Sequence, residues 1–234
     1  MLSTDAVDRR GYRRSPVTLA DYRRGCPPPN KGRTFPPEPL TPREVYALMD
    51  ACGHASAGRR NRALIMLLWR TGLRCAEALA LEPKDVDLQR GEVRVLHGKG
   101  DRSRVVALDP AAAAVLEVWA RERSALKVGP RRRFFCVISQ PTVGAPLHSA
   151  YVRELLKELA VKAGIEKRVH PHGLRHTYAS WLAEQGTPVH HIRRMLGHGS
   201  IAITERYLDH LNPADVLAAM RAVPWPEAPP PSTM

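Results

Sequence analysis

The hydrophobic pattern of this chain changes its period twice, and the two changes limit the folds that the chain can adopt. Apolar residues recur at helical spacing over much of residues 41–81 and again from residue 110 onward. From Glu92 to Leu108 they alternate with polar residues, which is typical of strands, and His97-Gly-Lys-Gly-Asp101 supplies a turn between two such segments. We therefore predict a mostly α fold with a small antiparallel β-sheet (α+β).

Local signals place the individual helices of this fold. Thr41-Pro-Arg-Glu44 has the form of a capping box, with a proline at the first helical position. The strongly apolar segment 60–69 predicts a buried helix, and Gly72 provides its C-terminal stop. A short helix is expected within residues 73–81. Further helices are expected over residues 110–123, 151–163, 174–185, 189–195, 201–208 and 213–223, and a short strand over residues 134–138.

Residues 1–40 differ in composition from the rest of the chain. They contain repeated arginine pairs and runs of proline, which remove backbone donors and interrupt any helix. Two interpretations are open: a disordered, solvated tail, or a basic arm that lies along phosphates and orders only on binding. We expect an N-terminal arm over residues 1–40, a folded domain over residues 41–222 and a flexible, proline-rich tail over residues 223–234.

The charge of the chain favours a polyanionic partner. The formal net charge is +13, and each Lys or Arg that neutralises a phosphate releases a condensed counterion. Charge alone does not separate DNA from RNA or an acidic membrane, but an aromatic content of 6% argues against a stacking platform for single strands. The chain has no apolar run of membrane-spanning length and no signal peptide, so we expect it in the cytoplasm. Its four cysteines form no C-x-x-C motif, which argues against a disulfide framework.

Residues 170–210 contain seven of the ten histidines, interleaved with Arg175 and Tyr207 among other residues. Histidine pairs occur in zinc sites, but the glutamate of an H-E-x-x-H motif is missing here, and we expect no metal. We expect four of these histidines at surface or capping positions: His170, His190, His191 and His210.

Five motifs, taken together and in order, resemble those of the tyrosine recombinase (phage integrase) family. The resemblance covers roughly residues 41–222, and every motif lies near the spacing usual in the family. The motifs are Arg74-x-x-Glu77, Lys99 between two glycines, His172-x-x-Arg175-His176, Leu196-Gly-His198, and Tyr207 nine residues later.

The resemblance implies a covalent mechanism for breaking DNA. Tyr207 would attack a phosphodiester and form a 3′-phosphotyrosyl link, which conserves the bond energy without a metal or a nucleotide cofactor. Arg74 and Arg175 would bind the non-bridging oxygens, where negative charge accumulates, because guanidinium is always charged and its fork matches two oxygens. By similarity, His198 would donate to the same phosphate.

The family resemblance also implies roles in proton transfer and support. His172 would assist deprotonation of the tyrosine, whose ordinary pKa is about 10. Lys99 would protonate the departing 5′-oxygen, although Gly-Lys-Gly also forms an ordinary exposed turn. Glu77 would hold the cations of the site in place, and His176 would have a supporting role.

The implied function is site-specific strand exchange on double-stranded DNA at attachment or core-type sites. Integration of a phage or mobile element is the leading interpretation, and Xer-like resolution of chromosome or plasmid dimers is its rival. A non-cutting DNA-binding regulator on the same fold is the alternative from another class. The resemblance also implies a tetramer on DNA, with the segment 213–223 either passed to a neighbouring protomer or packed on its own domain. The sequence leaves open whether an accessory DNA-bending protein takes part.

One feature departs from the family pattern. Most members have a sizeable helical core-binding domain before the catalytic domain, whereas about forty Pro- and Arg-rich residues stand in that place here. The sequence therefore resembles a minimal, arm-less integrase. We expect weak, salt-sensitive binding to one half-site, tightened by assembly on paired sites.

Overall fold

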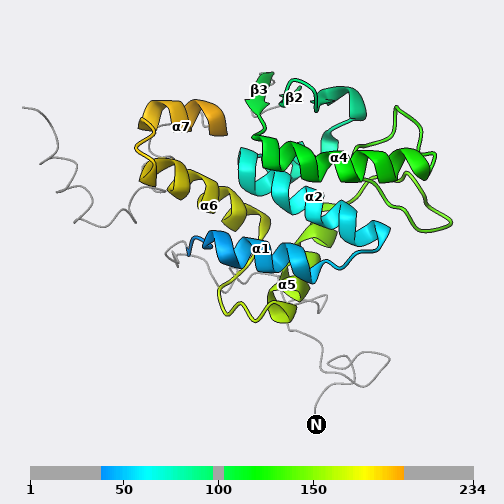
Figure 1. Ribbon diagram of the computed structural model, residues 1–234, viewed down its shortest axis with the longest axis horizontal. Helices are drawn as coiled ribbons and strands as arrows, with labels where there is room; N and C mark the ends of the chain where they lie inside the picture. The colour runs from blue at the N-terminus through cyan, green and yellow to red at the C-terminus, as the bar shows by residue number, and fades with distance from the viewer. Residues whose placement is uncertain (1–37, 97–102, 198–234) are drawn as a thin grey trace, which may run out of the picture. The chain divides into compact units, whose positions relative to one another are not determined.

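The computed structural model describes residues 38–96 and 103–197, which form a helical domain with one small sheet (Figure 1). Residues 1–37, which form most of the predicted arm 1–40, residues 97–102 with Lys99, and the chain from His198 onward, with Tyr207 and both predicted C-terminal helices, lie outside the described residues. The described elements are α1 (Pro42–Ala51), α2 (Ser56–Thr71), α3 (Cys75–Ala80), the 3₁₀ helix η3 (Pro83–Asp85), β1 (Val86–Asp87), β2 (Glu92–Val95), β3 (Arg104–Ala107), α4 (Pro110–Ala125), α5 (Ser149–Lys162), α6 (Pro171–Glu184) and α7 (Val189–Leu196).

The sheet has three antiparallel strands in the order β1-β2-β3, which confirms the predicted fold class. Strand β2 pairs with β3 so that Val93 lies opposite Val106 and Val95 lies opposite Arg104. The two-residue strand β1, in which Val86 lies opposite Val93, was not predicted. Two residues are too few for an alternating pattern to be recognised.

Helix α1 begins with the predicted capping box. The Thr41 hydroxyl accepts a hydrogen bond from the Glu44 amide at 3.2 Å, and the Glu44 carboxylate accepts one from the Thr41 amide at 2.7 Å. The Lys167 ammonium donates to the same carboxylate at 2.8 Å, and the Leu40 amide donates to the Thr177 hydroxyl at 3.0 Å. The start of the described chain is thereby tied to α6.

The predicted strand over residues 134–138 is wrong. Only an isolated bridge between Cys136 and Pro146 is present in this region of the described chain. The backbone of Phe134 bonds elsewhere: its amide donates to the Leu81 carbonyl at 2.7 Å, and its carbonyl accepts from the Trp119 indole at 3.0 Å. Apolar character here reflects burial in the core rather than strand pairing, which periodicity alone does not distinguish.

Three helices begin earlier than predicted, and α5 does so by two residues, at Ser149 rather than at residue 151. Helix α2 starts at Ser56 rather than at residue 60, and α6 starts at Pro171 rather than at residue 174. His170 is the N-cap of α6, as expected of a capping residue, and its Nδ1 accepts a hydrogen bond from the Gly173 amide at 3.1 Å. The earlier start adds His172 to the first turn of α6, which is followed by Arg175.

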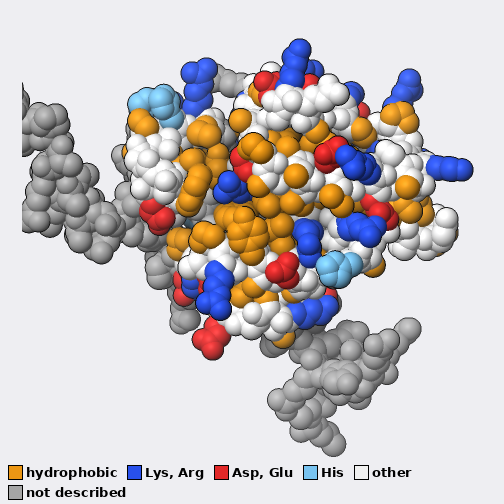
Figure 2. Space-filling model, in the orientation of Figure 1, with side chains coloured by type: hydrophobic (Ala, Val, Ile, Leu, Met, Phe, Trp, Pro, Cys, Tyr) orange, Lys and Arg blue, Asp and Glu red, His pale blue; other side chains and the backbone are white. Residues whose placement is uncertain are grey.

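The face shown in Figure 2 carries many Lys and Arg side chains, with acidic side chains between them. Within residues 38–96 and 103–197, no helix is long and apolar enough to cross a lipid bilayer. The cysteines of these residues, Cys52, Cys75 and Cys136, are free thiols.

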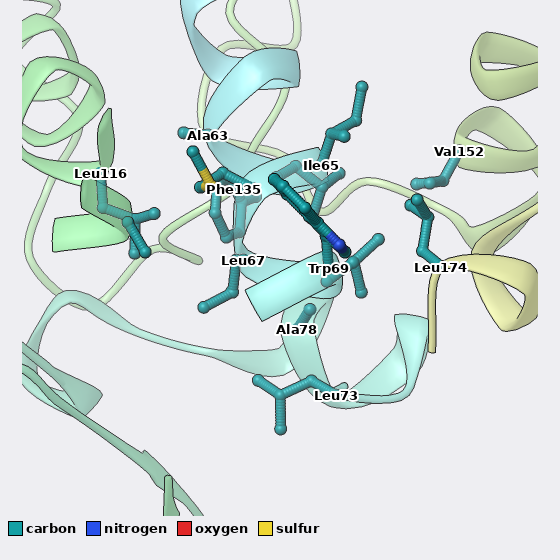
Figure 3. Close-up of a cluster of buried hydrophobic side chains, with 14 of the residues drawn as sticks. Ala63, Ile65, Leu67, Trp69, Leu73, Ala78, Leu116, Phe135, Val152 and Leu174 are labelled. Carbon is teal, nitrogen blue, oxygen red and sulfur yellow. The ribbon is translucent and has the colours of Figure 1, made fainter. Parts of the chain in front are cut away.

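Helix α2 lies at the centre of the core and is buried along most of its length. It contacts α4 on one side and α6 and α1 on others, and Figure 3 shows Ile65, Leu67 and Trp69 among the buried side chains. The helix ends where predicted, at Gly72, which adopts a left-handed conformation with φ of 61°. Because α2 is fixed on several sides, the turn that follows it is a rigid platform for the residues at 73–75.

Candidate functional site

A cavity of about 400 Å³ opens beside the turn between α2 and α3. Its walls also come from the start of α5, the loop before α6 and the first turns of α6. Four arginines and two histidines line it, and the described residues of its wall include no carboxylate. The lining consists of Leu73, Arg74, Cys75, Ser149, Arg153, Arg168, His170, Pro171, His172 and Arg175.

Arg175 is a rigid part of this cavity, since only 1% of the residue is exposed. One guanidinium nitrogen, Nη1, donates to the Gly72 carbonyl at 2.6 Å, and the other, Nη2, donates to the Leu196 carbonyl at 2.6 Å. Both carbonyls lie at helix C-termini, where the helix dipole favours a cation. The side chain is therefore fixed between the ends of α2 and α7 before any ligand arrives.

Arg74 is held less tightly than Arg175. It is the N-cap of α3, in an extended conformation, and its side chain is 32% exposed. Its Nη1 donates to the Glu77 carboxylate at 2.7 Å, and its Nη2 donates to the Gly197 carbonyl at 3.2 Å. Arg74 and Glu77 do not share a helical face, because Arg74 precedes the first residue of α3. These two contacts leave further N–H donors of the guanidinium for a ligand.

Glu77 joins two arginines from different elements. Its side chain is 5% exposed and accepts hydrogen bonds from Arg74 and, at 3.1 and 2.7 Å, from both terminal nitrogens of Arg104 on β3. Burial raises the pKa of Glu77, but the hydrogen bonds from Arg104 and from the Arg74 backbone lower it, so the pKa lies below its ordinary value. The carboxylate therefore stays charged and holds cations together.

His172 lines the cavity together with His170. Its ring lies 4.6 Å from the ring of His176, at an interplanar angle of 80°, and 6.4 Å from the ring of His170. Burial lowers the pKa of His172 below its ordinary value, and neighbouring charges, that of Arg175 first, lower it further. A neutral imidazole in this position can accept a proton.

The turn Leu196-Gly197 completes the described part of the site. Gly197 ends α7 in a left-handed conformation with φ of 66°, and Ile192 and Leu196 anchor the helix in a small apolar cluster with Tyr178. The carbonyls of Leu196 and Gly197 accept hydrogen bonds from the two cavity arginines. The residue that follows this turn, His198, lies outside the described residues, as do Lys99 and Tyr207.

The structure thus brings Arg74, Glu77, His172 and Arg175 together from segments far apart in sequence. His176 lies beside His172. The arrangement provides preorganised positive charge, a neutral histidine and no competing carboxylate in the described cavity wall, which together suit a phosphate or another anion. No group of three or more His, Cys, Asp or Glu side chains that could hold a metal ion occurs in the described part of the chain.

Three arginines of the site were missed by sequence reasoning. Arg153 and Arg168 line the cavity, and Arg104 binds Glu77. A signal for Arg104 existed, because strand alternation places it on the same face as the buried Val106, where a charge needs a partner. No comparable pattern marks Arg153 or Arg168.

Comparison with known proteins identifies the class to which this fold and site belong. The model of the phage integrase family matches residues 38–213, which is most of the chain. The chain belongs to the phage integrase family, which confirms the resemblance found in its motifs.

Individual relatives place the chain within that family. It is 36% identical over 193 residues to the tyrosine recombinase XerD of Corynebacterium glutamicum, covering 80% of this chain and 62% of that protein. The chain thus spans less than two thirds of this relative's length. The chain is also similar to the crystal structure of the XerA recombinase, with 30% sequence identity and a TM-score of 0.68. This match covers 85% of this chain and 70% of that one. The XerH recombinase bound to palindromic difH substrate, in a post-cleavage complex, is 28% identical, with a TM-score of 0.64, over 80% of this chain and 54% of that one.

Proposed function

We propose that this protein is a site-specific DNA recombinase that cuts and rejoins double-stranded DNA through a 3′-phosphotyrosyl intermediate. The observation that carries the proposal is the cavity lined by Arg74, Arg175 and His172, which combines fixed guanidinium donors with a neutral histidine. The catalytic domain comprises residues 41–222, the arm 1–40 contacts DNA, and residues 223–234 form a tail.

The proposed chemistry follows from the charge that develops during phosphoryl transfer. The Tyr207 oxygen forms a bond to phosphorus while the bond from phosphorus to the 5′-oxygen breaks, and negative charge accumulates on the non-bridging oxygens. Arg175 and Arg74 supply the compensating charge. Because Arg175 is already fixed by two carbonyls 2.6 Å away, it needs little reorganisation when the charge appears.

Two proton transfers complete the step. His172 accepts the proton of the Tyr207 hydroxyl, a role supported by a pKa that lies below the ordinary value of histidine. Lys99 donates a proton to the departing 5′-oxygen, and His198 donates a hydrogen bond to the phosphate. His176 and Glu77 support the reacting groups.

The partner that we propose is duplex DNA with attachment or core-type sites. A similar recombinase, XerH, has been solved with its difH substrate, and the net charge of +13 of this chain suits the same kind of ligand. We further propose that the protein assembles as a tetramer on DNA in the cytoplasm, at the nucleoid.

Integration of a phage or mobile element is the biological role that we propose. Xer-like resolution of chromosome or plasmid dimers is the second candidate, favoured by the similarity to a curated relative named XerD. A non-cutting regulator is disfavoured because the cavity keeps the donors that bond breakage requires.

A nicked duplex that traps the cleaved strand tests this proposal. The duplex carries the sequence that flanks the gene in its genome, and the short strand released on cleavage diffuses away, so that religation fails. Wild-type protein is expected to form an adduct that survives denaturing electrophoresis, and Tyr207→Phe is expected to form none. An equal adduct with Tyr207→Phe, or no adduct with the wild type, would contradict the proposal.

A further inference from the structure

Arg104 is the first residue of β3 and follows Lys99 by five positions in the sequence. Its side chain is 15% exposed and forms a two-pronged pair with Glu77, from Nη1 to Oε1 at 3.1 Å and from Nη2 to Oε2 at 2.7 Å. Arg104 does not line the cavity, so it does not touch a ligand bound there. The contacts of Arg104 with the cavity wall run through Glu77 and the turn at Gly197.

The charges of the three linked side chains show what Arg104 contributes. Glu77 bonds to Arg74 at 2.7 Å on one side and to Arg104 on the other, so the trio carries a net charge of one positive unit. Without Arg104, the negative charge of Glu77 would offset that of Arg74 completely. The carboxylate oxygens vacated by Arg104 could also accept a second hydrogen bond from Arg74, which would turn its donors away from the cavity.

Arg104 also supports the turn that follows α7. A Cβ atom built on Gly197 would lie 3.3 Å from Cζ and from Nη1 of Arg104, so the guanidinium packs against this glycine. The carbonyl of Gly197 in turn accepts the hydrogen bond from Arg74. Arg104 therefore borders both groups that hold Arg74 in place, the Glu77 carboxylate and the Gly197 turn.

We infer that Arg104 is a positioning residue for strand cleavage: it neutralises Glu77 and so leaves the charge of Arg74 available to the scissile phosphate. The inference rests on the proposed function and deepens it. An arginine is suited to this role because its fork engages both carboxylate oxygens at once. The Nε of Arg104 is buried without a hydrogen-bond partner among the described residues. The side chain therefore engages Glu77 through its two terminal nitrogens while one of its own donors is left unsatisfied.

The first experiment compares two scissile groups in the nicked duplex. One duplex has an ordinary phosphate, and the other has a methylphosphonate, in which a neutral methyl group replaces a charged oxygen. Arg104→Met is expected to slow adduct formation about 10- to 100-fold with the phosphate, as is usual when an outer partner of a site is lost. With the methylphosphonate the difference from wild type should shrink to about threefold or less, because less charge needs compensation.

Arg94→Met is the matched control. Arg94 belongs to the same hairpin, but it is exposed on the opposite face of β2 from Val93 and Val95. This variant should stay within about twofold of wild type on both duplexes. Arg104→Lys keeps the charge but not the fork, and its rate should lie between those of wild type and Arg104→Met.

A second-site variant separates charge compensation from general structural damage. If Arg104 acts by neutralising Glu77, then Glu77→Gln combined with Arg104→Met should cleave the phosphate duplex faster than Arg104→Met alone. Residues in direct contact show such non-additive effects. Equal defects of Arg104→Met on the two duplexes, or a double variant slower than Arg104→Met, would overturn the inference.

The outcomes also separate this inference from the proposed function. A wild-type adduct accompanied by an unimpaired Arg104→Met would refute the role of Arg104 and leave the recombinase proposal intact. Absence of any wild-type adduct would refute the recombinase proposal, and the role of Arg104 with it.

Discussion

Arg175 and Arg74 carry the same charge at the same cavity, but they are held in different ways. Arg175 is 1% exposed and satisfies two buried carbonyls, whereas the Arg74 side chain is 32% exposed. Arg175→Lys should therefore lose both stability and cleavage. The ammonium cannot reach both carbonyls, and an unsatisfied buried acceptor costs about 1–3 kcal/mol.

Arg74→Lys is the companion variant. It should slow cleavage about 10²- to 10³-fold, as the loss of one preorganised donor usually does, with little change in melting temperature. Thermal melts and adduct assays on both variants test the pair. Equal melting temperatures for Arg175→Lys and wild type would contradict the structural part of this account.

A second prediction concerns the dependence of stability and cleavage on pH, which follows from the pKa of His172. Burial lowers the pKa of His172, and burial together with Arg168 lowers the pKa of His170, so the folded protein holds these protons less tightly than the unfolded chain. Stability should then fall as the pH is lowered from about 6.5 through the folded pKa values, because the unfolded state binds more protons there. The base form of His172 should also persist below pH 6.5, which places the acidic limb of the cleavage profile below that value.

Titration of labelled histidines by NMR measures this prediction directly, with His172→Asn to assign the signal. A pKa of His172 above 6.5, or a cleavage rate that already falls between pH 8 and 7, would count against a neutral histidine at the site.

Some residues of the site could be predicted from the sequence, and others could not. Arg74, Glu77, His172 and Arg175 belong to short motifs whose spacing is visible in the chain. Arg104 was missed because its importance depends on strand pairing that turns it toward Glu77, across 27 positions of sequence. The carbonyl acceptors of the turn at residues 196–197 were missed for a similar reason, since backbone groups carry no sequence signal.

Gly72 is the point where helices α2, α6 and α7 meet. Its φ is 61°, and a Cβ atom there would lie 2.5 Å from Cδ1 of Tyr178 and 2.7 Å from Cδ2 of Leu196. Gly72→Ala should cost about 1–2 kcal/mol for the left-handed backbone and about 1–3 kcal/mol more for the clash. It should also impair cleavage, because the Gly72 carbonyl holds Arg175.

Gly186→Ala is the control for this substitution. Gly186 has a φ of 73°, and a Cβ atom added there would meet no atom within 4 Å, so its variant should lose only the backbone contribution to stability. Denaturant unfolding of both variants gives the comparison. Equal losses of stability would mean that the crowding at Gly72 has no energetic consequence.

The sequence predicted some ends of helices correctly and others wrongly, for physical reasons. The helix signals at Thr41 and Gly72 succeeded because capping and left-handed termination are local. The start of α6 was placed three residues late because its cap is a histidine, which the usual capping preferences do not include. The apolar segment 134–138 was assigned to a strand because burial in a helical core produces the same pattern.

The net positive charge of the molecule should make the affinity for DNA depend on the salt concentration. Each phosphate contact contributes about −0.9 to the slope of log K against log salt concentration. Exchange of both Arg153 and Arg168 for glutamine should flatten this slope by about two, because both line the cavity. Arg90→Gln is the control, since Arg90 is paired with Asp87 and 78% exposed. Fluorescence anisotropy over a salt series measures the slopes, and nanomolar binding by one protomer that is insensitive to salt would contradict the expectation.

The order of the motifs was enough to predict the family and the fold class, because five spaced signals rarely coincide. It could not predict how the motifs meet, since the cavity combines residues at 73–75, 149–153 and 168–175 through packing around α2. The extent of the contacts with DNA stays a prediction. The positions of Lys99, His198 and Tyr207 and the assembly of protomers stay predictions as well.

The residue that carries the DNA in the covalent adduct identifies the nucleophile. The wild-type adduct from the nicked duplex is digested with nuclease and protease, and the peptides are sequenced by mass spectrometry. We expect a nucleotide attached through its 3′-phosphate to Tyr207. A nucleotide on any other residue, or attachment through a 5′-phosphate, would contradict it.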